Sequence, residues 1–343
     1  MKSSNRSLPA LIVHGGAGAR APSLDRMAHR QGILKAARYG VEILQQGGLA
    51  LDAVTSVVKA LEDDPLFNAG YGSVLTAEGT VEMDAALMTF TPAAAAMTAG
   101  PRSRNHADES MKSTGAAGTS GPRPALAARA GGAVAAVSRV RNPILLARAV
   151  MELTPHVLMT GAGAERLARR ARLRLCRPSD LITERARARW RAALDRQLVQ
   201  VSYGSEYGTV GAVAVDSQGR IAAATSTGGV TGKMAGRIGD SAIIGAGVFA
   251  SEAGGSSATG QGEAIIQSAL CREAVSRVAR SGALAAAQRA VAVLARTTSG
   301  EAGVIVLDRR GRFGYAHNAE SMQVALYDVS GGLRQLWVEP MRS

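Results

Sequence analysis

The first half of the chain alternates apolar segments that fit strands with segments that fit helices. An apolar run leads into a glycine loop at 10–19, which predicts a strand followed by a turn. Residues 23–48 have the apolar spacing of an amphipathic helix with Ser23 as a candidate N-cap, and residues 51–64 predict a second helix. Residues 68–88 predict a loop followed by a hairpin.

The second half predicts hairpins enclosed by helices. Hairpins are expected at 209–227 and 303–318, with an apolar run between them at 242–250. A glycine- and serine-rich loop then leads to a helix from Glu263, and another helix is expected near 284–296. Because no strand–helix–strand order repeats, the pattern favours an α+β fold, with sheets covered by helices, over a doubly wound parallel sheet.

Two segments depart from this pattern. Residues 89–128 are rich in Pro, Gly, Ser, Thr and Ala and show little periodicity, so we predict a mostly disordered insertion there. A strand is expected at 131–138 and a helix over 142–152. Residues 165–196 hold eleven Arg against four acidic residues, which is typical of a solvated basic helix or a linker.

Composition narrows the class of protein. The 343 residues are 46% hydrophobic but only 3% aromatic, which predicts a core of small aliphatic side chains within one compact unit. No apolar run approaches the roughly 18 residues needed to cross a bilayer, and the apolar run near the N-terminus is too short for a signal peptide. A cytoplasmic location is therefore expected, with no membrane partner. The two cysteines and five histidines form neither a disulfide framework nor a transition-metal pattern.

The net charge of +13 raises the alternative of a non-enzymatic, nucleic-acid-binding protein. Much of the excess lies in the Arg-rich segment, where only Trp190 could stack on a base. No nucleic-acid-binding motif accompanies it, so no nucleic-acid partner is expected.

The predicted hairpin at 209–227 raises a chemical question because a threonine stands at each open end. If the loop at 217–219 closes the hairpin, Asp216 faces Arg220 and Thr209 faces Thr227. A cross-strand threonine pair can be purely structural. Small residues around Thr209 would alternatively leave room for a ligand or for backbone rearrangement.

Polar residues follow in the next loops. Arg237 and Asp240 stand three apart and could hold the carboxylate and the ammonium of an amino acid, or form a surface salt bridge. The stretch 257–266 carries a glycine turn that opens a helix, so its N–H groups could stabilise an oxyanion, or it is an ordinary helix start.

Seven stretches together resemble the plant-type L-asparaginases and isoaspartyl aminopeptidases, which are N-terminal-nucleophile hydrolases. They run in family order across nearly the whole chain, at 14–19, 61–74, 138–144, 154–168, 208–229, 236–247 and 258–266. The resemblance implies a four-layer αββα sandwich and self-cleavage between Gly208 and Thr209. The products would be an α subunit (1–208), with 165–208 as its mobile tail, and a β subunit (209–343), assembled as an (αβ)₂ dimer.

The resemblance also implies a mechanism that needs no catalytic cofactor. The Thr209 hydroxyl, with the freed α-amine as its base, would attack the side-chain amide of L-asparagine or of a β-aspartyl dipeptide and release L-aspartate. Thr227 would orient Thr209, while Arg237 and Asp240 would hold the α-carboxylate and α-ammonium of the substrate. Four further residues would supply the oxyanion donors (Thr259, Gly260), line the α-amine pocket (Gly262) and lie near the scissile bond (Asn68).

A structural Na⁺ is a further implication of the resemblance. Main-chain carbonyls would hold it, from Leu61, Glu62, Asp64, Phe67, Ala69 and Tyr71.

Some features depart from the family pattern or fit rivals. The insertion follows Met88, where relatives have an Asp-Gly turn, and the stretch before 258–266 is about one residue shorter than in some relatives. A glycosylasparaginase-type amidase uses the same nucleophile and stays an alternative. The stretch 16–21 has the form of a dinucleotide-binding fingerprint, but Pro22 and a late helix start disturb the required strand–turn–helix context.

Overall fold

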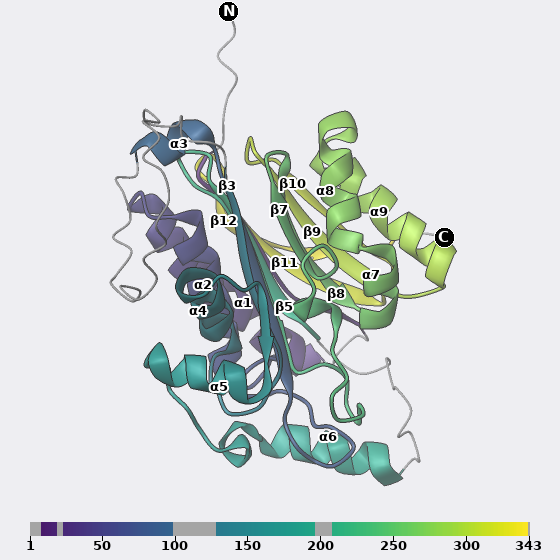
Figure 1. The fold of residues 1–343 in the computed structure, drawn as a ribbon. Helices are drawn as coiled ribbons and strands as arrows, with labels where there is room; N and C mark the ends of the chain where they lie inside the picture. The colour runs from purple at the N-terminus through teal and green to yellow at the C-terminus, as the bar shows by residue number, and fades with distance from the viewer. Residues whose placement is uncertain (1–7, 19–22, 99–127, 196–207, 342–343) are drawn as a thin grey trace, which may run out of the picture.

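The computed structural model describes residues 8–18, 23–98, 128–195 and 208–341. Two β-sheets lie face to face at its centre, and helices cover the outer face of each sheet (Figure 1). This mixed arrangement of four layers agrees with the α+β class that the sequence predicts.

The larger sheet has eight strands and draws on both halves of the chain. In spatial order, the third to sixth strands are antiparallel to one another. The chain before residue 208 supplies the outer two of these four strands, and the chain after residue 208 supplies the inner two. In spatial order the strands are β12 (Gly332–Val338), β11 (Ser321–Asp328), β1 (Ala10–Gly18), β5 (Val210–Val215), β6 (Ile221–Thr227), β2 (Met83–Thr91), β3 (Ala128–Val137) and β4 (Leu158–Thr160).

The smaller sheet has four strands and comes from the last third of the chain. Its strands, in spatial order, are β10 (Phe313–His317), β9 (Ala302–Asp308), β8 (Gly254–Gly260) and β7 (Val248–Ser251). A buried apolar cluster that includes Val213, Val248 and Ile305 fills the space between the two sheets.

Helices close the two outer faces. The larger sheet packs against α1 (Ser23–Gln45), α2 (Ala50–Asp63) and α4 (Pro143–Leu153), and the smaller against α8 (Leu270–Ser281) and α9 (Ala283–Thr298). The remaining helices are α3 (Ala93–Thr98), α5 (Gly161–Arg170), α6 (Glu184–Asp195) and α7 (Gly262–Ser268), with 3₁₀ turns at Pro178–Leu181 and Asp240–Ala242. The outer cores are rich in Ala, Val and Leu, as the composition predicts.

The hairpins predicted at 209–227 and 303–318 are confirmed, and so is the register of the first. The hairpin predicted within 68–88 is wrong, because only Leu75 and Val81 form a bridge there and β2 pairs instead with β3 and β6. In the β5–β6 pair Val210 lies opposite Ser226, so Thr209 and Thr227 flank the pair at its open end. Asp216 closes the turn by accepting hydrogen bonds from the N–H groups of Gln218 and Arg220, both at 3.0 Å. Asp308 closes the β9–β10 turn in the same way.

The predicted insertion at 89–128 is wrong at both of its ends. Residues 89–91 continue β2, residues 93–98 form α3, and β3 already begins at Ala128. β2 and β3 extend into this segment because they pair with each other, with Thr91 opposite Ala128. The small and polar residues of the segment show little strand periodicity, so the sequence did not predict these ends. The centre of the predicted insertion, 99–127, lies outside the described residues.

The predicted mobile tail at 165–208 contains helices where the structure describes it, and its mobility stays a prediction. Residues 165–170 complete α5, and α6 carries the basic run to Asp195. Leu181 and Ala186 are buried and anchor the segment. Residues 196–207 lie outside the described part.

Two further differences concern strands. The predicted loop before Glu263 contains β8, and the C-terminal strands β11 and β12 had not been predicted. No helix in the described ranges is long and apolar enough to span a membrane. The cytoplasmic location stays a prediction.

Candidate active site

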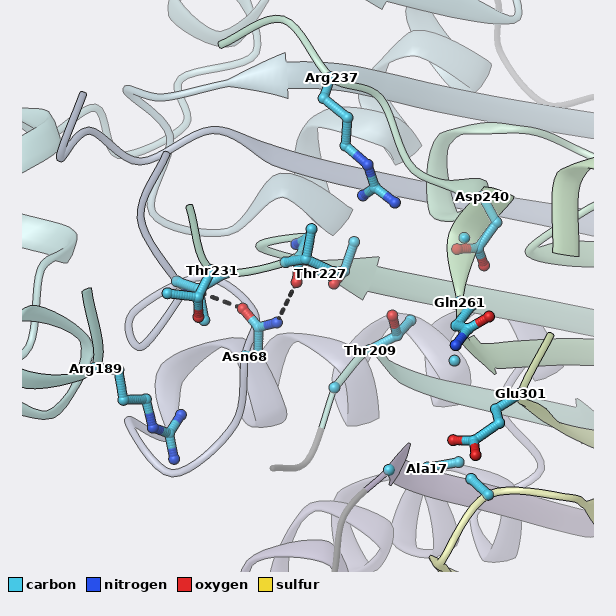
Figure 2. A pocket seen from close by; sticks show the side chains of 18 residues that line it. Ala17, Asn68, Arg189, Thr209, Thr227, Thr231, Arg237, Asp240, Gln261 and Glu301 are labelled. Carbon is cyan, nitrogen blue, oxygen red and sulfur yellow. Dashed lines mark hydrogen bonds between the residues drawn. The ribbon is translucent and has the colours of Figure 1, made fainter. Parts of the chain in front are cut away.

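A cavity opens where the β5–β6 hairpin ends against β8 and α7, and most of the predicted site residues meet there (Figure 2). Residues from the end of β1, from α6 and from the loops after α2 and β6 complete its wall. The lining consists of Ala17, Gly18, Asn68, Val74, Arg189, Gly208, Thr209, Thr227, Gly229, Val230, Thr231, Arg237, Asp240, Gly260, Gln261, Gly262, Glu301 and Ala319.

Thr209 lies directly before β5, at the centre of the cavity wall (Figure 2). Only 5% of its surface is exposed, and Gly208 lies beside it on the same wall. The Thr227 hydroxyl accepts a hydrogen bond from the N–H of Gly229 at 3.0 Å, so the loop after β6 fixes its position. The structure therefore brings both threonines of the predicted hairpin into one cavity.

The back of the Thr209 strand is packed too tightly for a larger residue. A Cβ atom on Gly211 would lie 2.0 Å from Ser257 Oγ and 2.5 Å from His14 Nε2. His14 and Ser257 are hydrogen-bonded at 2.9 Å, and burial lowers the pKa of His14 to about 3, so the imidazole is neutral. Gly211 thus serves packing, and the space beside it is filled by protein.

Asp240 forms an anionic end of the cavity. Its side chain is 3% exposed, and its Oδ2 has no hydrogen-bond partner within the described residues. Burial raises the pKa of Asp240 to about 7, and the charge of Arg237 works in the opposite direction. A buried carboxylate without a partner is costly, so a ligand cation would stabilise it. These features suit the predicted role as an ammonium ligand.

Arg237 enters the cavity from the loop after β6. Its Nε and Nη2 atoms contact the two carboxylate oxygens of Glu263 at 2.9 and 2.8 Å. Glu263 is the more exposed partner, with 47% of its side chain accessible against 16% for Arg237. The Glu263 carboxylate thereby orients the Arg237 guanidinium. The resemblance implies that the same guanidinium holds the α-carboxylate of the substrate.

Asp84 anchors the loop that carries both of these residues. Its carboxylate accepts hydrogen bonds from the N–H of Gly239 at 2.8 Å and from that of Ala136 at 2.9 Å. Because Gly239 lies between Arg237 and Asp240, this contact ties their loop to β2 and β3.

Thr259 and Gly260 end β8, and Thr259 lies beside Gly208. Gly260 lines the cavity with a φ of +132°, and a Cβ atom added there would lie 2.5 Å from the Glu301 carbonyl oxygen, so the position requires glycine. Thr259 is fully buried, and its hydroxyl accepts a hydrogen bond from the N–H of Ala17 at 3.1 Å. The Thr259 hydroxyl remains able to donate its own proton, and it lies next to Gly208.

Asn68 lies on the opposite wall of the cavity, where its side chain hydrogen-bonds to two backbone groups. Its Oδ1 accepts from the N–H of Val74 at 3.0 Å, and its Nδ2 donates to the carbonyl of Gly229 at 2.7 Å. Since Gly229 also contacts Thr227, Asn68 connects the predicted cation loop to the threonine pair.

The predicted cation loop, residues 61–71, fits a hard cation. Leu61 and Glu62 lie in the last turn of α2, where carbonyls lack helical partners and the helix dipole is negative. The N–H of Tyr71 donates to the Glu62 carbonyl at 2.7 Å and closes the loop, and each carbonyl keeps a second lone pair. No cluster of three or more His, Cys, Asp or Glu side chains suited to a metal occurs in the described ranges.

Several lining residues were not predicted from the sequence. Gln261 and Glu301 line the side near Asp240, while Thr231 and Arg189 line the side near Asn68 (Figure 2). The helix start at Glu263 was predicted, but its contact with Arg237 was not. Arg189 stands among eleven arginines, and no sequence signal separated it from the others.

Comparison with known proteins identifies the family of the chain. The asparaginase family matches residues 7–100 and 127–334. The isoaspartyl peptidase/L-asparaginase of Bos taurus is 39% identical over 318 residues, covering 92% of this chain and 91% of that protein. That of Xenopus laevis is 40% identical over 265 residues, covering 77% and 74%. The plant-type L-asparaginase of Pyrococcus abyssi is 38% identical over 331 residues, covering 92% and 95%.

The chain therefore belongs to the asparaginase family, and it is a hydrolase. Membership of this family gives no support to the alternatives of a dinucleotide-binding protein and of a non-enzymatic basic protein. The family match breaks between residues 100 and 127, inside the segment predicted to be an insertion.

Proposed function

We propose that this hydrolase matures by cutting itself between Gly208 and Thr209, as N-terminal-nucleophile hydrolases do, and then cleaves the side-chain amides of L-asparagine and β-aspartyl dipeptides. The observation that carries this proposal is one cavity that joins the Thr209 hydroxyl with Arg237 and with Asp240, whose Oδ2 has no hydrogen-bond partner within the described residues. The names of the relatives, isoaspartyl peptidase/L-asparaginase and plant-type L-asparaginase, support the same two substrates.

Maturation would use the groups around Gly208. The Thr209 Oγ attacks the Gly208 carbonyl carbon, the C–N bond breaks, and the Thr209 nitrogen takes a proton to become an amine. Water then hydrolyses the ester, leaving a carboxylate on Gly208 and a free hydroxyl on Thr209. Hydrogen-bond donors aimed at the developing oxyanion would lower the barrier, and the Thr259 hydroxyl beside Gly208 suits this role.

Turnover would repeat this chemistry on the substrate. An α-amine has a pKa near 7.7–8.0, so at neutral pH part of it can accept the proton of the Thr209 hydroxyl. The substrate side-chain carbonyl is attacked, the amine leaves with the proton, and water hydrolyses the aspartyl ester to L-aspartate. Arg237 and Asp240 would fix the α-carboxylate and the α-ammonium, and Gly260 would complete the oxyanion site.

The two predicted subunits would stay together as an αβ unit, and we propose that two units form the (αβ)₂ dimer. Intact-mass spectrometry of the purified protein after incubation at neutral pH tests the cut. Two fragments that meet at the Gly208–Thr209 bond are expected. A single chain that stays uncut for days and still hydrolyses either substrate would contradict the proposed mechanism.

Replacing Gly262 by Ala is expected to obstruct the amino-acid end of the cavity. The new Cβ would lie 2.8 Å from Arg237 Nη2 and 3.1 Å from Asp240 Oδ1, between the two proposed ligands of the substrate. We expect KM for L-asparagine to rise about tenfold or more, while the cut still occurs. Gly163→Ala is a matched control because its Cβ would meet nothing closer than 3.7 Å. An unchanged KM would place the substrate elsewhere.

The binding of L-aspartate, measured as competitive inhibition, is expected to strengthen about tenfold from pH 6 to pH 8. Burial raises the pKa of Asp240 to about 7, and only the ionised carboxylate, which predominates above that pH, attracts an ammonium. Succinate lacks the ammonium and should not gain affinity in this way. Asp240→Asn should remove the difference between the two ligands. Parallel pH profiles for both ligands in the unmodified enzyme would refute the role of Asp240.

We further propose that the main-chain oxygens of residues 61–71 hold Na⁺, which would keep Asn68 in place and supply no chemistry to the reaction. Replacing Na⁺ with N-methylglucamine at equal ionic strength should lower the melting temperature, because a ligand that binds only the folded state stabilises it. A melting temperature that does not change between zero and high Na⁺ would rule the site out.

A further inference from the structure

Lys233 is a buried cation close to the active-site cavity, and the proposed reaction gives it no role. It belongs to the loop after β6 that also carries Arg237 and Asp240, and only 3% of its surface is exposed. Its ammonium donates a hydrogen bond to the Glu82 carbonyl oxygen at 2.8 Å. A buried charge is costly unless opposite charge lies nearby, so the position of Lys233 requires an explanation.

The ammonium lies close to the guanidinium that is proposed to hold the substrate. Gly229 lines the cavity, and a Cβ atom added to it would lie 3.0 Å from Lys233 Nζ and 3.4 Å from Arg237 Nη1. The two nitrogens therefore cannot be further apart than these two distances together. Burial lowers the pKa of Lys233, and the charge of Arg237 adds to this effect. The carboxylates of Asp84 and Glu82 oppose it. Two positive charges thus lie close together beside one wall residue of the cavity.

The loop is also held to the start of β2 by two backbone groups. The N–H of Gly236 donates to Glu82 Oε2 at 2.8 Å. The N–H of Gly239 donates to Asp84 Oδ2, also at 2.8 Å. Both contacts would survive the loss of the Lys233 ammonium, so the loop should keep its course without it. What these contacts cannot replace is the positive charge.

The carboxylates around Arg237 give this charge a use. Glu263 binds Arg237 Nε and Nη2 at 2.9 and 2.8 Å. On the other side, a Cβ atom on Gly239 would lie 3.1 Å from Arg237 Nη1 and 3.4 Å from Asp84 Oδ2. If Lys233 were uncharged, these two carboxylates would outnumber the guanidinium and weaken its attraction for a third carboxylate.

We propose that Lys233 is a positioning residue of the amino-acid end of the cavity, where its ammonium offsets the carboxylates around Arg237 and so strengthens the binding of the substrate α-carboxylate. Lys233 does not itself line the cavity in the described structure, so it acts through Arg237. Arg237 and Asp240 lie together at that end (Figure 2). The interaction changes no covalent bond. It rests on the proposed function, since it assumes that Arg237 holds the α-carboxylate.

The test measures Ki for L-aspartate and for succinate at pH 8, with KM and kcat for L-asparagine, on fully cleaved enzyme. Lys233→Met should raise both Ki values and KM about tenfold and leave kcat within about twofold. The ratio of the two Ki values should not change, because it reports the ammonium that only L-aspartate presents to Asp240. Lys233→Gln removes the charge but keeps a donor for the Glu82 carbonyl, and it should weaken both ligands to a similar degree. Lys35→Met, at an exposed position on α1, is the matched control.

The outcomes separate the role of Lys233 from the proposed function. Unchanged Ki values in Lys233→Met, or normal values in Lys233→Gln, overturn the role of the charge. A changed ratio of the two Ki values, or loss of self-cleavage in both variants, assigns Lys233 to the folding of the loop and overturns the proposal as well. The same rise in Lys35→Met also overturns it. An unmodified enzyme that is cleaved but hydrolyses neither substrate overturns the proposed function and this role together.

Discussion

Thr209→Ala is expected to leave one uncut chain that hydrolyses neither L-asparagine nor β-aspartyl peptides, with activity at least about 10⁴-fold below that of the unmodified protein. The variant lacks the hydroxyl proposed to attack Gly208, so the α-amine proposed as the base in turnover would never be released. Loss of one side-chain group therefore removes both reactions. Mass spectrometry and an assay for released aspartate, on the same sample, measure the two effects.

Two variants show whether the loss is chemical or structural. Thr209→Ser keeps the hydroxyl and should be cut and active, although more slowly. Thr297→Ala removes a hydroxyl that donates to the Val293 carbonyl on α9, on the outer face of the smaller sheet, and should behave as the unmodified protein. An uncut Thr209→Ala chain that still releases aspartate would exclude Thr209 as the nucleophile.

Arg237→Ala is expected to lower kcat/KM for both substrates about 100- to 1,000-fold while the chain still cuts itself. A substrate carboxylate would lose a charge-assisted fork of hydrogen bonds, and these are among the stronger polar interactions in proteins. Self-cleavage needs no bound amino acid, so it should be spared. Kinetics on fully cleaved enzyme give kcat/KM, and a separate time course of cleavage gives the rate of self-cleavage.

Arg280→Ala is the control for charge, since this residue is exposed in the last turn of α8. Glu263→Gln separates orientation from binding because it weakens the carboxylate that holds Arg237 and leaves the guanidinium in place. If Arg237→Ala slowed cleavage as much as turnover, the residue would be holding the loop rather than the substrate.

The sequence predicted most of the elements that show their own periodicity. The β5–β6 hairpin could be predicted to the residue because its turn begins with Asp216, whose carboxylate binds the N–H groups of the loop. β8 could not, because it is made of Gly, Ser, Ala and Thr. Its small residues reflect contact with the other sheet: a Cβ on Gly255 would lie 2.8 Å from Val213 Cγ1. Such a requirement depends on a neighbour far away in the sequence.

The site was predictable only in part for the same reason. Thr209, Thr227, Arg237 and Asp240 stand in stretches that resemble a family, and the structure brings them into one cavity. Their proposed roles remain predictions. Arg189 lines that cavity because of the way α6 packs, which places one arginine of a long basic run at the wall. Glu263 takes part only through its contact with Arg237.

The strand order of the larger sheet has a consequence for the mature enzyme. β5 and β6, which follow the proposed cut, lie between β1 and β2, which precede it. Neither fragment can leave without unzipping hydrogen bonds on both sides of the hairpin. Once denatured, the uncut precursor can refold as a single chain, whereas two separated fragments must first meet. Maturation thus turns a unimolecular folding reaction into a concentration-dependent assembly, and the lifetime of the mature enzyme rests on its unfolding barrier.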